Sequence, residues 1–260
     1  MKKKEFLKLA RDPKFISGIY NYCDRWCERC PFTDRCVNYA MECEENKQDG
    51  GPPRNMAAFW KRFEASLKLT QEMISDMAKE QGVTFDPVAL EQSSREETHK
   101  RRAIEKHPLA KAARDYSGMA EAWFKSGETA LREKEEEILA QARLGVRGVK
   151  EEVASLTDAV EILRWYQDQI YVKLMRGLDA NKEYEARSEF PKDSDGSVKV
   201  ALIAMDRSIA AWLRMKEFFP DQTDTILTML VDLDRLRRAA EKEFPDARAF
   251  VRPGFDTGGK

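Results

Sequence analysis

An apolar seam of helical period runs through KEEVASLTDAVEILRWYQDQIYVKLMRGL, residues 150–178. Its large apolar side chains recur every three or four positions, the spacing that places residues on one face of an α-helix. The seam consists of Leu156, Val160, Leu163, Ile170 and Leu174. A helix with one apolar face buries that face against another element, so this stretch predicts a long helix in a helical core.

The same period extends through most of the chain on both sides of this seam. We expect further helices over about 56–81, 109–143 and 198–219 and from 221 onward, with a polar helical stretch over 87–106 and a loop over 191–197. Asn55 and Asp86 stand where N-caps are expected, and Pro87 suits a first helical position. Long amphipathic helices joined by short breaks predict an all-α fold, an antiparallel helical bundle of four to five helices.

Composition and charge exclude several classes of protein. The chain has 260 residues, 42% of them hydrophobic and 35% charged, which excludes wholesale disorder and collagen-like sequence. Its net charge of -1 makes nucleic acid an unexpected partner. No apolar run is long enough to cross a membrane, and the basic start is not followed by an apolar signal segment. We therefore expect a cytoplasmic protein with no membrane partner.

All five cysteines of the chain lie between Cys23 and Cys43, which indicates one local site. After them the sequence EENKQDGGPPRN, residues 44–55, carries a Gly-Gly-Pro-Pro core that suits neither helix nor strand. We place a domain boundary there. The expected organisation is a Cys-rich metal module over 1–45, a linker over 46–55, a helical bundle over 56–245 and a tail over 246–260.

The cysteines have the spacing of a metal-binding motif. Cys23, Cys27 and Cys30 stand at i, i+4 and i+7, so in a helix their three sulfurs would share one face. Pro31 favours a turn that can bring Cys36 back to complete a set of four thiolates. Such a set suits either zinc or an iron-sulfur cluster. A disulfide framework is not expected in a chain without an export signal.

The segment CERCPFTDRC, residues 27–36, resembles half of the [4Fe-4S] loop of helix-hairpin-helix DNA glycosylases. The resemblance covers only residues 23–36 and implies a cluster bound by Cys23, Cys27, Cys30 and Cys36, without implying DNA repair. Those glycosylases have six residues between their first ligand and the Cys pair, whereas only three residues separate Cys23 from Cys27. The fourth ligand is therefore Cys23 or Cys43. A [4Fe-4S] cluster is favoured, and zinc is the alternative.

Two weaker constellations lie in the helical region. Glu96 and His99 have the Glu-x-x-His spacing of di-iron bundles, but a second copy of that motif is absent and a solvated helix is expected. Asp206 falls on or beside an apolar face, where a carboxylate is expected to have an arginine or another hydrogen-bonding partner; a role in proton transfer or ligand binding is the alternative. A helical-bundle metalloenzyme that uses Glu96, His99 and Asp206 is a third, minor hypothesis.

The sequence thus predicts a metal-centre protein, with a [4Fe-4S] cluster for electron transfer or redox sensing. A protein partner is expected, because a cluster with four protein ligands has no open iron site for a substrate. The alternative is a zinc-stabilised helical adaptor without catalytic activity, in which the metal folds the N-terminal segment.

Overall fold

The computed structural model describes residues 3–53, 55–84, 86–180 and 192–256. Within these residues it contains nine α-helices, five short 3-10 turns and no strand. The predicted all-α class is confirmed, although the described helices outnumber the four to five that were expected. The chain divides into two compact units, of which the first comprises Met1–Thr98 with Arg252–Lys260 and the second comprises His99–Val251. Each unit is described by itself.

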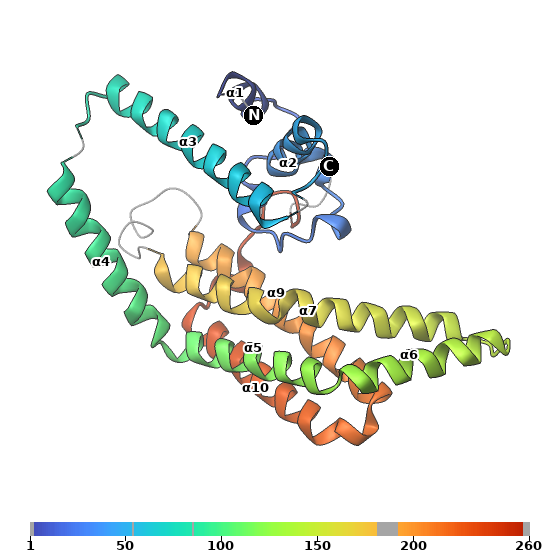
Figure 1. Ribbon diagram of the computed structural model, residues 1–260. Coiled ribbons are helices and arrows are strands. Elements are labelled where there is room, and N and C mark those ends of the chain that lie inside the picture. The colour runs from blue at the N-terminus through green and yellow to red at the C-terminus, as the bar shows by residue number, and fades with distance from the viewer. Residues whose placement is uncertain (1–2, 54, 85, 181–191, 257–260) are drawn as a thin grey trace. The chain divides into compact units, whose positions relative to one another are not determined.

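The first unit contains three whole helices and most of a fourth. These are α1 (Lys3–Ala10), α2 (Val37–Asp49), α3 (Met56–Glu80) and α4 (Pro87–Glu105), and three 3-10 turns separate α1 from α2 (Figure 1). Both predicted caps are confirmed: the Asn55 side chain accepts from the backbone N–H of Ala58 at 2.9 Å, and Asp86 accepts from Val88 at 2.9 Å. Each cap satisfies a backbone donor that the first helical turn leaves without a partner.

The second unit is built from five helices, α5 (Pro108–Ser126), α6 (Glu128–Arg143), α7 (Val149–Asp179), α9 (Asp193–Phe218) and α10 (Thr223–Glu243). Helices α7 and α9 run side by side over much of their length (Figure 1). Helix α5 packs on α7 and α10, α10 packs on α9, and α6 packs on α7. The seam over 150–178 therefore lies in a helical core, as predicted, and Leu163, Ile170 and Leu174 are fully buried.

Aromatic side chains fill the centre of this second core. The indole N–H of Trp212 donates to the hydroxyl of Tyr116 at 3.1 Å, and both side chains are fully buried. The ring of Trp123 meets the ring of Trp212 edge-on, with 5.2 Å between the ring centroids. Burial raises the pKa of Tyr116 to about 12, so this hydroxyl stays protonated and available for hydrogen bonding.

A glycine lets α7 and α9 approach closely. A Cβ atom at Gly177 would lie 2.5 Å from Cγ2 of Val198 and 3.3 Å from the carbonyl oxygen of Ser194. Real Cβ atoms do not come that close, so only glycine permits this crossing without a shift of the neighbouring helix.

The structure corrects two of the predicted elements. The single helix over 109–143 is broken at Ser126 and Gly127, a residue pair typical of helix breaks, and becomes α5 and α6. The loop predicted over 191–197 is helical from Asp193 onward, and Ser194 and Ser197 are buried in α9. Its polar composition indicated a turn, but packing of this segment in the core overrides the local preference.

The division into units differs from the predicted domains. The helix α3 was expected in the bundle of residues 56–245, yet it belongs to the first unit and contains no buried side chain. Helix α2 also continues to Asp49, into the expected linker. In the expected tail, Ala247 and Phe250 are buried, and the segment from Arg252 groups with the N-terminal residues.

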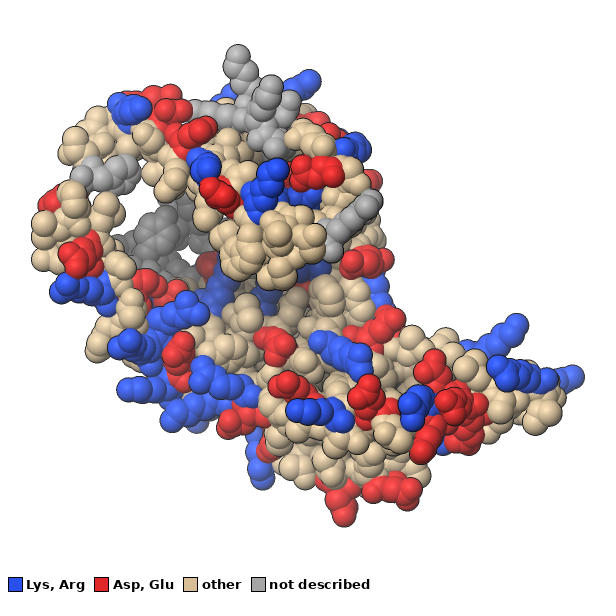
Figure 2. All heavy atoms as spheres, viewed as in Figure 1, with Lys and Arg blue, Asp and Glu red and all other residues tan. Residues whose placement is uncertain are grey.

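Acidic and basic side chains are intermixed over most of the face that Figure 2 shows, in agreement with the net charge of -1. No helix among the described residues is long and apolar enough to cross a membrane.

Candidate metal centre

The cysteine loop between α1 and α2 is built from short turns. It contains the 3-10 turns η1 (Ile19–Asn21), η2 (Cys27–Arg29) and η3 (Thr33–Arg35). The prediction that Cys23, Cys27 and Cys30 share a helix face is therefore wrong. No α-helix runs through these three cysteines, and an interruption before Cys27 places the backbone in a left-handed conformation that a right-handed helix does not contain.

That interruption lies at Arg25, whose φ of 59° is the one positive value at a non-glycine residue in the described chain. Asp24 supports the turn, since its Oδ1 accepts from the backbone N–H of Trp26 at 3.2 Å. The N–H of Cys27 then bonds the carbonyl oxygen of Arg25 at 3.0 Å, which closes a tight three-residue turn. Left-handed backbone at a residue with a Cβ is strained, and such strain persists where the surroundings enforce it.

A second turn follows Pro31 and brings Cys36 back toward the first cysteines, as predicted. The backbone N–H of Phe32 lies 3.5 Å from the sulfur of Cys30, within reach of a weak N–H···S hydrogen bond. The N–H of Ile16 bonds the carbonyl oxygen of Arg35 at 3.0 Å and ties this turn to the residues before Cys23. The loop is thus held at both of its ends by backbone hydrogen bonds.

The four predicted ligands line one hollow in this loop. Its walls come from η1, η2, η3, the start of α2 and the C-terminal segment. The lining comprises Cys23, Cys27, Cys30 and Cys36 together with Ile19, Tyr20, Asp24, Arg25, Trp26, Thr33, Asn38, Tyr39 and Phe255. The structure therefore brings together, around one space, the side chains that sequence spacing had selected.

The thiols do not form a finished ligand cage. Among the described residues, no three His, Cys, Asp or Glu side chains are grouped so that they could hold a metal ion. All five cysteines are free thiols without a disulfide. Metal binding at this loop thus requires the sulfur atoms to draw closer together than they stand here.

Burial and negative neighbours disfavour the charged form of these thiols. Burial, then the charges of Cys23 and Glu42, raises the pKa of Cys27 to about 11. Burial also raises the pKa of Cys30, with Cys23 and Asp24 contributing, while the N–H of Phe32 works in the opposite direction. Several thiolates can share this space only if a cation compensates their charge.

Cys43 lies apart from this set. It is on α2 and is absent from the lining of the hollow, and its side chain shares a hydrogen bond with Tyr39. The sequence left open whether Cys23 or Cys43 is the fourth ligand, and Cys23 is the one that lines the hollow beside the other three.

The C-terminal segment contributes a wall that sequence analysis missed. Phe255 lines the hollow, and its ring meets Phe32 edge-on with 5.1 Å between centroids. The backbone at Gly254 runs so close to η1, within the same unit, that a Cβ there would lie 2.9 Å from Cδ1 of Ile19. Arg252 closes the segment through two hydrogen bonds to Asp256, at 2.9 and 3.0 Å. No local pattern links residues so distant in sequence, so only the fold reveals this contact.

The weaker constellations do not join this site. Glu96 and His99 are exposed side chains on α4. In the second unit, Asp206 accepts hydrogen bonds from Arg248 at 2.5 and 3.2 Å and from Arg237 at 3.2 Å, which confirms the predicted structural pairing and shows that arginines provide it. Burial raises the pKa of Asp206, but the hydrogen bonds from both arginines outweigh it and hold that pKa below its usual value. These contacts satisfy the carboxylate without a metal.

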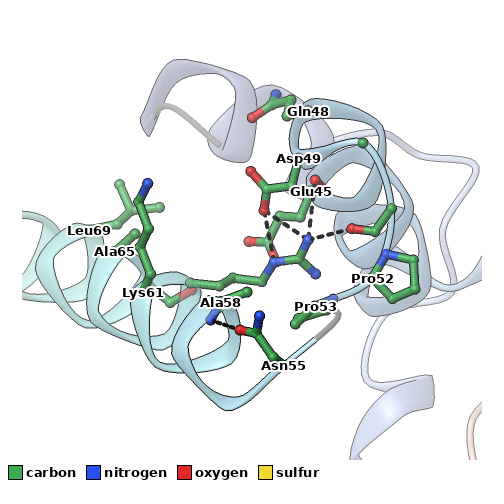
Figure 3. Close-up of a pocket in the computed structure, with 14 residues that line it drawn as sticks. Glu45, Gln48, Asp49, Pro52, Pro53, Asn55, Ala58, Lys61, Ala65 and Leu69 are labelled. Carbon is green, nitrogen blue, oxygen red and sulfur yellow. Dashed lines mark hydrogen bonds and ion pairs between the residues drawn. The ribbon is translucent and has the colours of Figure 1, made fainter.

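A groove of the first unit lies between α2 and α3 (Figure 3). Arg62 crosses it and donates to Asp49 at 2.8 and 3.0 Å, to Asn46 at 2.8 Å and to the carbonyl oxygen of Gly51 at 3.2 Å. Because its guanidinium is occupied by these partners, Arg62 fastens α3 to the end of α2 and is not left for a ligand.

No family model matches the chain, and no curated protein or solved structure does so either. The local resemblance of residues 23–36 to the glycosylase cluster loop therefore remains a prediction.

Proposed function

We propose that the N-terminal unit binds a metal centre through Cys23, Cys27, Cys30 and Cys36, and that this centre is a [4Fe-4S] cluster. One observation carries the proposal: these four thiols line a single hollow although they are spread over the loop, with Cys23 between η1 and η2, Cys27 and Cys30 at the two ends of η2, and Cys36 after η3. Free buried thiols packed only as small apolar side chains would not need to face one common space.

The spacing of the ligands favours a cluster over a single zinc ion. Structural zinc usually takes two short Cys pairs from separated segments. Here one continuous loop supplies unequally spaced cysteines, and Pro31 follows the third, as is common in cluster loops. By ligand chemistry alone, four soft thiolates suit the iron of such a cluster as well as they suit zinc.

The surroundings of the hollow suit a redox role. The backbone N–H of Phe32 near the sulfur of Cys30 favours extra negative charge on a bound centre, and so does the positive charge of Arg25, a residue of the lining. Tyr20, Trp26, Tyr39 and Phe255 limit the access of water. With four protein ligands, the proposed role is electron transfer or redox sensing, exercised on a protein partner.

Anaerobic purification followed by iron, sulfide and zinc analysis tests the proposal. We expect about four iron and four sulfide per chain, with a brown colour that bleaches on reduction. One zinc per chain without iron would overturn the cluster and leave the zinc-stabilised adaptor as the function of the same thiols. Protein that binds neither metal, even after anaerobic reconstitution with iron and sulfide, would overturn the metal centre altogether.

A further inference from the structure

The helix α3 presents an unusual apolar surface. None of its 25 residues is buried, yet it carries seven apolar side chains that are about half exposed. They are Met56, Phe59, Trp60, Phe63, Leu67, Ile74 and Met77, of which Trp60 and Met77 are each 55% exposed. The rings of Phe59, Trp60 and Phe63 contact one another, with centroids 5.4 to 6.2 Å apart. Most helical stability comes from packing of such a face, yet no described residue of the chain buries this one.

The apolar residues of α3 follow a heptad repeat. Trp60, Leu67 and Ile74 are seven residues apart and occupy positions a, and Met56, Phe63, Thr70 and Met77 occupy positions d. An apolar repeat of this 3.5-residue period favours a left-handed coiled coil over packing on a globular core. We call these a and d residues the heptad seam.

The heptad seam points away from the contact between α3 and α2. The groove between these helices is lined on α3 by Ala58, Lys61, Arg62, Ala65, Ser66 and Leu69, none of which belongs to the seam (Figure 3). At 100° per residue, the centre of this lining lies roughly 150° around the helix from the centre of the seam. Arg62 can therefore hold α3 on α2 while the seam contacts another helix.

The residues that flank the seam are compatible with a second copy of the same helix. Positions e and g between Phe59 and Glu80 contain two charged residues, Glu64 and Glu80, and no lysine or arginine. In a parallel pair, Glu64 would face Phe59 of the other copy, so no two like charges meet. A different helix with basic residues along its flanks would find only these two glutamates to pair with.

Thr70 is the one polar residue of the heptad seam. Its hydroxyl already donates to the carbonyl oxygen of Ser66 at 2.9 Å, so burial in a helix pair would leave no donor unsatisfied. A parallel, in-register pair places Thr70 against Thr70 and every apolar seam residue against an apolar one. The exposed half of the six apolar seam side chains amounts to about 1,200 Å² for a pair, the lower limit of stable interfaces.

From the period, the flanking charges and the available area, we infer that α3 is a dimerisation helix. Two copies of the chain pair through their heptad seams in a short, parallel coiled coil. The inference uses no cysteine and does not depend on the metal centre.

Light scattering and sedimentation of the full chain, under reducing conditions and at about 1 to 100 μM, test this inference. We expect a concentration-dependent mass approaching twice 30.0 kDa. Leu67→Lys places a charge in the seam and should weaken the dimer by roughly 100-fold, whereas Ser75→Lys, an exposed position off the seam, should leave it intact. Thr70→Ile removes the polar layer and should tighten the dimer.

Each opposite result would overturn the inference. A wild-type chain that stays monomeric at 100 μM indicates that the seam is covered by the chain itself. A dimer that survives Leu67→Lys, or that Thr70→Ile does not strengthen, places the interface elsewhere. Circular dichroism of each variant shows whether the helices are retained.

Discussion

The ring of Phe255 stands at 84° to the ring of Phe32, with 5.1 Å between their centroids, and thereby joins the end of the chain to the cysteine loop. Phe255 also lines the hollow of the four cysteines, and the guanidinium of Arg252 lies over its ring, 4.9 Å from the centroid. The C-terminal segment is thus a structural part of the proposed metal centre, although more than 200 residues separate it from the loop.

We predict that Phe255→Ala weakens metal retention. Loss of the ring opens the hollow to water, and the loss of an outer contact at a metal site typically costs 10- to 100-fold in affinity. The rate of metal loss to a chelator should rise at least about tenfold. Val251→Ala changes an exposed side chain directly before this segment and serves as the control. Equal rates for the two variants would show that Phe255 does not shield the site.

Substitution by alanine should change stability in opposite directions at two helical glycines, because only one of them, Gly177, lies in the close crossing of α7 and α9. Gly177→Ala places a Cβ 2.5 Å from Val198 and should destabilise the protein by about 1–3 kcal/mol. Gly118→Ala, in α5, meets no atom within 4 Å and should stabilise it by about 0.5–1 kcal/mol through helix propensity. Urea unfolding followed by circular dichroism measures both.

The cause of the Gly177 effect can be checked by a second substitution. Val198→Ala removes the methyl group that the new Cβ would meet, so it should offset part of the loss in the Gly177→Ala background. If the double variant loses as much stability as Gly177→Ala and Val198→Ala lose together when measured singly, the contact between these two residues is not the cause of the Gly177 effect.

Tyr116→Phe should destabilise the second unit by about 1–3 kcal/mol. The substitution keeps the ring but leaves the buried indole N–H of Trp212 without its acceptor. The free energy of unfolding in urea, together with the near-ultraviolet circular dichroism of the aromatic cluster, measures the effect. Wild-type stability in this variant would mean that the hydrogen bond contributes nothing net.

The pairing of Asp206 with Arg237 and Arg248 predicts a pH-dependent contribution to stability. Because the pKa of Asp206 is lowered in the folded state, the unfolded chain binds its proton more readily. The stabilisation is therefore full above the unfolded pKa of about 4 and is lost as the pH falls through the folded value. Asp206→Asn should cost about 1 kcal/mol at pH 7, a modest value because water screens this half-exposed pair.

The same variant supplies the check at low pH. The difference in unfolding free energy between wild type and Asp206→Asn should shrink between pH 4 and pH 2, where both proteins carry a neutral side chain. A difference that stays constant over this range would show that the effect of the substitution is not electrostatic.

Helical period predicted most of the fold because it records which side of each helix is apolar. It placed α3, α4 and α7 to within about two residues, and the caps at Asn55 and Asp86 were readable from residue type. It could not show that the apolar face of α3 stays outside the core, since a coiled-coil seam and a core-facing stripe use the same residue types.

The candidate site was predictable in its residues and not in its geometry. Spacing selected Cys23, Cys27, Cys30 and Cys36, which line one hollow. The helix expected to align them is absent, because the backbone turns sharply at Arg25. The contribution of Phe255 depends on a contact between the two ends of the chain, which no short-range pattern encodes.

The metal content of single cysteine variants tests the central proposal most directly. Cys27→Ser and Cys36→Ser each remove a thiol that lines the hollow, whereas Cys43→Ser removes one that does not. All three should be purified anaerobically beside the wild type, with iron, sulfide and zinc measured per chain. We predict that the first two lose most of the bound metal and that Cys43→Ser retains the wild-type amount. Equal metal content in all three variants would contradict the assignment of the centre to this hollow.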